Sequence, residues 1–288
     1  MATFKIQSAM EYLMTYGWAI LIIAVVLGAL FGLGFFNSAS LSPKVGPGAC
    51  QVYRPQGPGS TAYINTEGVC SNEEPQFAAQ FSGAGASIPG QITVSGVSVP
   101  PAVSYSTIAF WMYSTSSTSG PAAFSYGTTA SNSIAFGATC FGIGGIYGIS
   151  AASVKNTWTF VAVTFNSLNA NDKVYINGAV PTTVCGVVPG AANQITPGST
   201  VYIGGSNVAS TTFNGIIANV QLYNYSLPTA DILTLYQDGI GAVPQSLNNL
   251  VGWWPLNSNP YDYSGNLYNG VSANVVFTSS WTTSYTAP

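Results

Sequence analysis

The sequence predicts a mainly β protein with one long N-terminal α-helix and an antiparallel β-sandwich head. Two observations carry this prediction. The stretch Trp18–Phe36 is almost wholly apolar, and no charged residue lies between Glu11 and Lys44. From Phe77 onward, short apolar segments alternate with clusters of Gly, Pro and Ser, a spacing typical of an all-β sandwich or jelly roll.

The N-terminal apolar stretch has the length of a membrane-crossing helix. As a helix, residues 12–36 would be about 37 Å long, enough to cross a bilayer. Its large apolar side chains make exposure to water unfavourable by tens of kcal/mol in total, at roughly 1.5–3 kcal/mol each. We therefore expect this helix to lie in lipid or inside a bundle of copies of itself.

The residues at the start of this helix resemble a known export signal. A short leader, MATFKI, precedes the string QSAMEYLMTYGWAIL. This string resembles the class III signal of archaeal type IV pilins and archaellum-like subunits. The resemblance implies that a prepilin peptidase cleaves between Ile6 and Gln7, which places Glu11 fifth in the mature chain, where pilins carry glutamate. Ile6 stands where that family usually has a small residue.

Three positions in the helix are candidates for assembly. Burying the Glu11 carboxylate beside an apolar helix is costly unless it is paired, and the new α-amino group at Gln7 is the nearest cation that processing supplies. Alternatively, Glu11 is solvated and supports only the helix N-terminus. Gly28 and Gly32 form a G-x-x-x-G that permits close helix approach, although glycine is frequent in membrane helices anyway.

Composition restricts the function classes. Only 5% of the 288 residues are charged, the net charge is −3, and histidine is absent. A nucleic-acid binder needs a basic patch, so nucleic acid is excluded as a partner. Without histidine, neither a Ser-His-Asp nor a Cys-His catalytic device can form.

Four cysteines lie beyond the apolar stretch: Cys50, Cys70, Cys140 and Cys185. In a translocated chain an even count indicates disulfides. Three pairings are possible, and proximity in sequence favours Cys50–Cys70 and Cys140–Cys185. A zinc site is the weaker alternative, because no C-x-x-C spacing and no histidine is present.

Domain boundaries follow from shifts in composition. We predict a leader at residues 1–6, a hydrophobic helix at 7–37 that serves as membrane anchor or filament core, and a junction at 38–76. The junction is rich in Pro and Gly, through which a helix cannot continue. The β-sandwich head is predicted at 77–288.

Two segments predict strands with defined surroundings. In residues 158–165 both alternating sets of side chains are apolar, as in a central strand covered on both faces. Residues 173–178 alternate, with Val174 and Ile176 pointing inward, and end in an Asn-Gly pair suited to a type I′ turn.

The next segments predict a strand followed by a helix. In residues 217–223 the predicted inward set is Ala218, Val220 and Leu222, which leaves Asn219, Gln221 and Tyr223 on the opposite face. Residues 229–237 carry the best helix signal of the head, with Thr229 as candidate N-cap and Gly239 as terminator.

Several of these segments together resemble the laminin G-like, concanavalin A-like jelly-roll family over residues 77–288. The matching pieces are residues 79–83, 107–112, 156–180, 201–205, 213–227 and 231–236. In that family a segment like residues 250–270 usually comes first, whereas here it comes last. Either this strand is permuted to the C-terminus or a second copy begins there. The roughly 39 remaining residues are too few for a domain, which favours permutation into the same sandwich.

Acidic residues offer no glycosidase pair. Such enzymes need two carboxylates facing one bond, and the acidic residues of the head show no alternation along one strand. They are Glu67, Glu73, Glu74, Asp172, Asp231, Asp238 and Asp262. We predict that the protein is not an enzyme.

Calcium is the one cofactor that the sequence suggests as a possibility. Oxygens of Asp262 and Asn266 are suited to calcium, which members of the resembled family often hold. The alternative is an Asx-type turn in which Asp262 bonds its own backbone. No other cofactor is expected.

A carbohydrate face is the remaining candidate site. Asn219, Gln221, Tyr223 and Tyr225 combine amides with aromatic rings, as sugar binding requires, although subunit packing or plain solvation explains the same pattern. Asn224-Tyr225-Ser226 is an N-glycosylation sequon.

These observations favour a structural subunit of an extracellular, archaeal type IV pilus-like filament. Its partners would be copies of itself, and the membrane before assembly. The alternative is a membrane-anchored, lectin-like adhesin, or a minor pilin, that binds glycans at the cell surface. An N-terminus at Gln7 in fibrous material supports the first, and an intact Met1 in detergent extracts supports the second.

Overall fold

The structure of the chain is a computed structural model. It describes residues 7–32, 52–53, 63–64, 75–83, 90–98, 105–118, 120–126, 133–136, 140–143, 147–166, 173–182, 199–208 and 211–288. In the N-terminal helix, side chains are described for residues 16–28. The chain divides into two compact units, residues 1–45 with 67–69, and residues 46–66 with 70–288.

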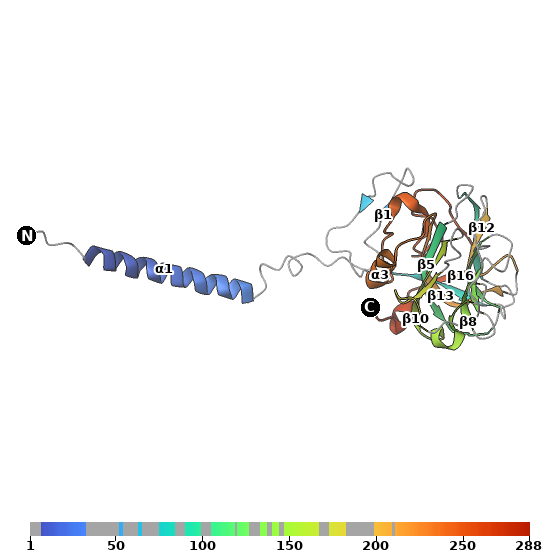
Figure 1. Ribbon diagram of the computed structural model, residues 1–288, viewed down its shortest axis with the longest axis horizontal. Helices are drawn as coiled ribbons and strands as arrows, with labels where there is room; N and C mark the ends of the chain where they lie inside the picture. The colour runs from blue at the N-terminus through green and yellow to red at the C-terminus, as the bar shows by residue number, and fades with distance from the viewer. Residues whose placement is uncertain are drawn as a thin grey trace, which may run out of the picture. The chain divides into compact units, whose positions relative to one another are not determined.

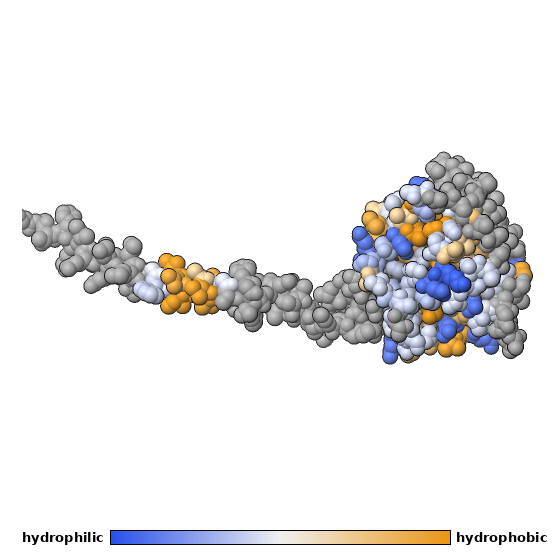
Figure 2. All heavy atoms as spheres, turned by 90° about the horizontal axis from the view of Figure 1, so that it is seen from below, coloured by the Kyte–Doolittle hydropathy of each residue, from blue (hydrophilic) through white to orange (hydrophobic). Residues whose placement is uncertain are grey.

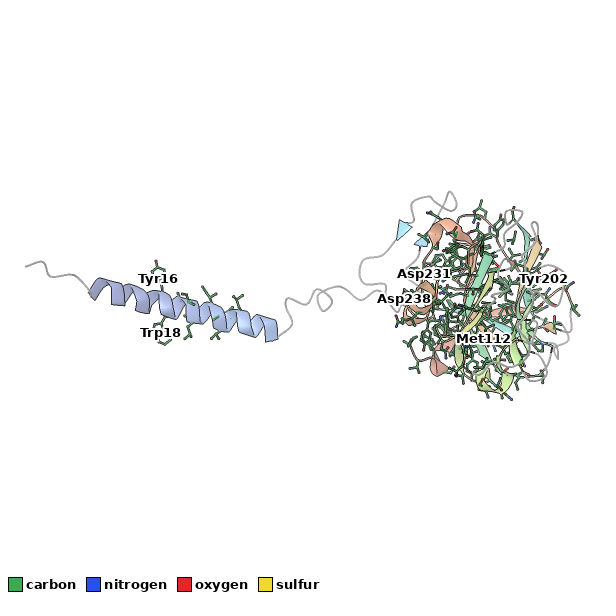
Figure 3. All side chains as sticks on the ribbon, in the orientation of Figure 1. Tyr16, Trp18, Met112, Tyr202, Asp231 and Asp238 are labelled. Atoms are coloured by element: carbon green, nitrogen blue, oxygen red, sulfur yellow. The ribbon has the colours of Figure 1, made fainter. Side chains whose placement is uncertain are left out.

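The first unit contains helix α1, Gln7–Gly32 (Figure 1). Its large apolar side chains between Tyr16 and Leu27 are 43% to 67% exposed. Figure 3 shows Tyr16 and Trp18 leaving the helix on opposite sides, and Figure 2 shows the described stretch as predominantly apolar. The predicted helix is therefore confirmed. Among the described residues, no helix combines the length and apolarity that crossing a membrane requires.

The second unit is a sandwich of two antiparallel sheets, which confirms the predicted fold class. The first sheet has the order β11-β10-β5-β13-β3-β16, and β14 also pairs with β13. Its described strands are β3 (Ala78–Ser82), β5 (Tyr105–Ser114), β10 (Trp158–Asn166), β11 (Lys173–Ile176), β13 (Asn214–Tyr223), β14 (Leu250–Trp254) and β16 (Val275–Thr278).

The second sheet has the order β15-β4-β12-β6-β7-β8-β9. Its described strands are β4 (Gln91–Val97), β6 (Ala122–Tyr126), β7 (Ser133–Phe136), β8 (Cys140–Ile143), β9 (Tyr147–Ser150), β12 (Ser199–Ile203) and β15 (Val271–Ala273). The smaller elements are the paired strands β1 (Val52–Tyr53) and β2 (Tyr63–Ile64), helix α3 (Thr229–Gln237), and the 3₁₀ turns η2 (Ala151–Val154), η4 (Leu247–Asn249) and η5 (Ser280–Ser284).

Two hydrophobic clusters hold the sandwich together. The inner cluster draws side chains from both sheets, such as Phe110 and Val161 from the first and Phe124 from the second. The outer cluster lies on the other face of the first sheet, where Trp111 and Phe160 pack with residues of α3 and η5. Strand β10 supplies both clusters in alternation, so the prediction of a strand covered on both faces is confirmed.

The C-terminal segment belongs to the same sandwich. Strand β14 pairs with Val220–Tyr223 of β13, and β3 pairs with Asn214–Ile217 of the same strand. Further along the chain, β15 joins β4 and β16 joins β3. Residues 250–278 thus add strands to both sheets of the same sandwich and do not begin a second copy.

Local chemistry explains two turns and corrects two details. Asn177 and Gly178 have φ of 50° and 78°, as a type I′ turn requires. In β13, Asn219 has φ of 52° and the register shifts between Ala218 and Gln221. This bulge places Ala218 in the outer cluster, so its predicted inward orientation is wrong. At α3 the N-cap is Pro228, not Thr229, and no side chain caps the helix.

Candidate functional site

The predicted carbohydrate face is mostly buried. Asn219, Gln221 and Tyr223 are 5%, 2% and 0% exposed, and only Tyr225, at 45%, reaches solvent. The strand alternates as predicted in this part, but the outer face is covered by α3 and the chain that follows it. Three of these four side chains therefore cannot contact a glycan, and the predicted face is wrong.

These buried side chains instead form a connected hydrogen-bond network. The Trp253 Nε1 donates to Asn219 Oδ1 at 2.7 Å, and Tyr223 Oη donates to Gln221 Oε1 at 2.6 Å. The amide nitrogens of Asn219 and Gln221 both donate to the Ala242 carbonyl, at 2.8 and 2.9 Å. Burial raises the pKa of Tyr223, so the phenol stays a neutral donor. The network fastens the chain after α3 to the sheet.

Asp262 is held by four donors. Its Oδ1 accepts from the backbone N–H groups of Trp253 and Ser264 at 2.9 and 2.8 Å. Its Oδ2 accepts from Ser264 Oγ at 2.8 Å and from the Tyr268 N–H at 3.0 Å. Burial raises the pKa of Asp262 above its usual 3.8, while these hydrogen bonds lower it, and burial prevails.

This arrangement does not fit the predicted calcium site. A carboxylate has about four lone-pair positions, and all are used by the four donors. The Asn266 amide nitrogen donates to the carbonyls of Leu250 and Val251, at 3.2 and 2.8 Å. In the described part of the chain no three acidic, cysteine or histidine side chains come together to hold a metal. As described, the Asp262 and Asn266 side chains do not fit a calcium site, and Asp262 instead forms the Asx-type turn that the sequence left open.

A small polar pocket lies on the outer face of the first sheet, beside the start of α3. We call it the hydroxyl pocket. It has a volume of about 200 Å³ and is lined by Thr164, Lys173, Tyr175, Ser226, Leu227, Pro228 and Thr229. Thr164 of β10 and Lys173 of β11 are direct cross-strand neighbours. The Tyr175 and Thr229 hydroxyl oxygens lie 3.2 Å apart.

The wall of the hydroxyl pocket is fixed by one buried threonine. Thr107 of β5 lies opposite Thr164 in the ladder. Its Oγ1 donates to the Tyr225 carbonyl at 2.7 Å and accepts from the Leu227 N–H at 2.9 Å. Thr107 makes both hydrogen bonds from a central strand, so the segment that begins at Ser226 is held in a fixed position over the sheet.

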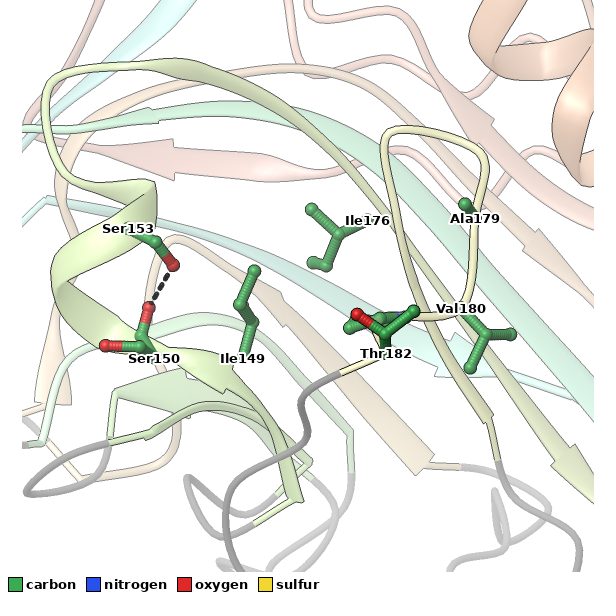
Figure 4. A pocket seen from close by; sticks show the side chains of 8 residues that line it. Ile149, Ser150, Ser153, Ile176, Ala179, Val180 and Thr182 are labelled. Carbon is green, nitrogen blue, oxygen red and sulfur yellow. Dashed lines mark hydrogen bonds between the residues drawn. The ribbon is translucent and has the colours of Figure 1, made fainter.

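A larger, apolar groove lies beside two edge strands, β11 of the first sheet and β9 of the second (Figure 4). Its volume is about 570 Å³, and it is lined by Ile149, Ser150, Ser153, Ile176, Ala179, Val180, Pro181 and Thr182. Ser153 Oγ donates to the Ser150 carbonyl at 2.6 Å. Ile149 and Ile176 also pack on the inner cluster, so this groove reaches the core.

The remaining predicted positions are only partly described. Gln7, Glu11 and Gly32 lie within α1, and a Cβ added to Gly28 would meet nothing within 4 Å. Ile6 lies outside the described residues.

The cysteine pairing stays a prediction. Cys140, which begins β8, is disulfide-bonded. Cys50, Cys70 and Cys185 lie outside the described residues.

The sequon lies just past β13. Asn224 is half-buried, and its backbone N–H donates to the Asn249 carbonyl at 3.0 Å. Glycosylation at this position stays a prediction.

The hydroxyl pocket is not predictable from the sequence pattern, because its lining residues come from separate elements. Lys173 was the one available signal, since it is one of only five cations and starts an alternating strand. Nothing in the local sequence indicates that Ser226 and Thr229 fold over that strand.

Comparisons with known proteins agree with the fold. The profile of the concanavalin A-like lectin/glucanases superfamily matches residues 87–233. No curated protein matches the chain significantly. A candidate carbohydrate-binding protein from Bacteroides ovatus is 14% identical with a TM-score of 0.49, over 76% of this chain and 66% of that protein. A heptameric SAP-like pentraxin from Limulus polyphemus is 16% identical with a TM-score of 0.48, over 70% of this chain and 94% of the pentraxin.

Proposed function

The chain belongs to the concanavalin A-like lectin/glucanases superfamily, and from this premise we propose that its sandwich is the outward head of an extracellular filament subunit. In this proposal the α1 helices of many copies pack together as the filament core.

The observation that carries the proposal is the apolar surface of α1. Trp18, Ile20 and Val25 are each more than 60% exposed, and they belong to an apolar stretch that surrounds the helix. A helix that is apolar all round is stable only when it is enclosed, because each large apolar side chain loses about 1.5–3 kcal/mol of burial free energy in water. Copies of α1 would supply that enclosure.

The resemblance of residues 7–21 to a class III signal supports the same assembly. Cleavage before Gln7 would create an α-amino group four residues from Glu11, and a neighbouring subunit's carboxylate would then pair with it. The proposed location is therefore the cell exterior.

The test is electron microscopy of the full-length protein, purified from its native cells, together with N-terminal sequencing. We expect uniform fibres whose subunits begin at Gln7. Glu11→Gln is expected to abolish fibres while the head stays folded by circular dichroism. Dispersed particles in the absence of detergent, with Met1 intact, would refute the filament.

A second candidate function is glycan adhesion, and the hydroxyl pocket favours it. Hydroxyl groups both donate and accept hydrogen bonds, as sugar hydroxyls require of a binding site. The volume of about 200 Å³ is smaller than that of a typical drug-sized site and suits a single sugar residue. Binding of the unglycosylated protein to a panel of immobilised glycans tests this function, and Tyr175→Phe should weaken it.

A further inference from the structure

The hydroxyl pocket combines one cation with several hydroxyl groups in a chain that has few cations. Lys173 and Lys155 are the lysines of the described residues, and Lys173 lines the hydroxyl pocket. Among the described residues Lys173 has no carboxylate partner. Its ammonium group therefore has donors available for a ligand.

The described lining contains no carboxylate. Asp172 directly precedes Lys173 in the sequence and lies outside the described residues. Among the described residues, the acidic residue nearest in sequence to the lining is Asp231, in the first turn of α3, and it does not line the pocket. Thr164 and Ser226 form no side-chain hydrogen bond with the described residues, so their hydroxyls are also available. The described lining thus offers one positive charge together with several hydroxyl groups.

Rigidity comes from the sheet beneath. Thr164, Lys173 and Tyr175 stand on two paired strands, and Thr107 fixes the opposite wall through two hydrogen bonds. Tyr175 is 2% exposed, so its ring is locked and only its hydroxyl group is directed to the pocket edge, 3.2 Å from Thr229 Oγ1. A site built on strands holds polar groups in fixed positions before a ligand arrives.

We propose that the hydroxyl pocket binds a sugar residue that carries a carboxylate, such as a uronic acid unit of an acidic polysaccharide. Lys173 pairs with the carboxylate, and the hydroxyls of Thr164, Ser226 and Thr229 bond the ring hydroxyls. This inference rests on the second candidate function, glycan adhesion, and assigns its ligand class.

The experiment uses the full-length, unglycosylated chain in detergent and isothermal titration with trigalacturonate. The matched probe is the methyl ester of trigalacturonate, which has the same rings without the charge. We expect the acid to bind about two- to fivefold more tightly than the ester, because an exposed ion pair contributes at most about fivefold. Lys173→Gln should remove this preference, Lys173→Arg should keep most of it, and the control Lys155→Gln should leave it unchanged.

Other outcomes overturn the inference in distinguishable ways. Equal binding of acid and ester, lost in Tyr175→Phe, would refute the acidic ligand and leave glycan adhesion standing. A preference for the acid that survives Lys173→Gln would place the anion elsewhere. Displacement of trigalacturonate by inorganic phosphate at equal concentration would show a bare anion site. Absence of binding to every sugar would overturn both the inference and the adhesive function, whereas the filament proposal would be judged by microscopy alone.

Discussion

Trp18 in α1 and Trp254 in the head are the same side chain in opposite surroundings. Trp18 is 67% exposed, whereas Trp254 is fully buried and its Nε1 donates to the Tyr268 carbonyl at 2.8 Å. The head encloses its own large side chains, and α1 leaves its own in solvent. The difference teaches that the head buries its large apolar side chains within its own fold, whereas the large apolar side chains of α1 are not buried within the helix's own unit.

The largest expected effect tests this contrast directly. Trp254→Ala should lower the free energy of unfolding of the head by about 3–5 kcal/mol, because it opens a cavity in the inner cluster. Trp18→Ala should change it by less than about 0.5 kcal/mol and should instead weaken assembly. Denaturant unfolding followed by near-UV circular dichroism measures both. Similar losses in the two variants would break the comparison.

The carboxylates Asp262 in the head and Glu11 in α1 allow the same comparison for polar side chains. Asp262→Ala removes the acceptor of four hydrogen bonds and should destabilise the head by about 3 kcal/mol, since buried donors are left unpaired. Its counterpart in α1, Glu11→Gln, should leave the unfolding of the head unchanged. The same chemical denaturation is the measurement, and a stable Asp262→Ala variant would show that the turn is dispensable.

Two glycines give a smaller but sharper comparison. Gly204 has φ of 76°, and an added Cβ would lie 2.2 Å from the Phe81 ring. Gly204→Ala should therefore destabilise the head by about 1–3 kcal/mol. Gly28→Ala meets nothing within 4 Å and should raise helix propensity by about 1 kcal/mol without altering the melting of the head. Calorimetry of both variants measures the melting temperature of the head. A lower melting temperature in Gly28→Ala would show that a change in α1 affects the stability of the head.

The smallest effect concerns pH. Because the pKa of Asp262 is raised in the folded head, the folded state binds more protons than the unfolded state above pH 3.8. Its contribution to stability is therefore fully present below pH 3.8 and is lost as the pH rises through the folded pKa. The difference in unfolding free energy between the wild type and Asp262→Asn should shrink over that window. If the difference in unfolding free energy between the two proteins instead grew with pH, the pKa of Asp262 would be lowered in the folded head, not raised.

Much of the fold was predictable because local pattern and tertiary environment agree. The two apolar sets of residues 158–165 predicted a strand with two covered faces, and β10 supplies both clusters. The Asn177-Gly178 pair predicted its turn through backbone sterics alone. The helix over residues 229–237 was predicted correctly, and Gly239 after it has the positive φ of a helix terminator. Its predicted cap, Thr229, was wrong, because Pro228 already fixes an extended backbone before the first turn.

The candidate site was less predictable, because it depends on which segments cover which face. The sequence determined that Asn219, Gln221 and Tyr223 share one face of a strand, since alternation is a property of the backbone. Only the tertiary structure decided that this face is buried under the chain after α3, and that Lys173 meets Ser226 and Thr229 in a pocket. The physical reason is that these segments are positioned by long-range packing, in which Trp111, Ile232 and Trp281 are buried together. The local sequence of each segment does not show which distant segment it will pack against.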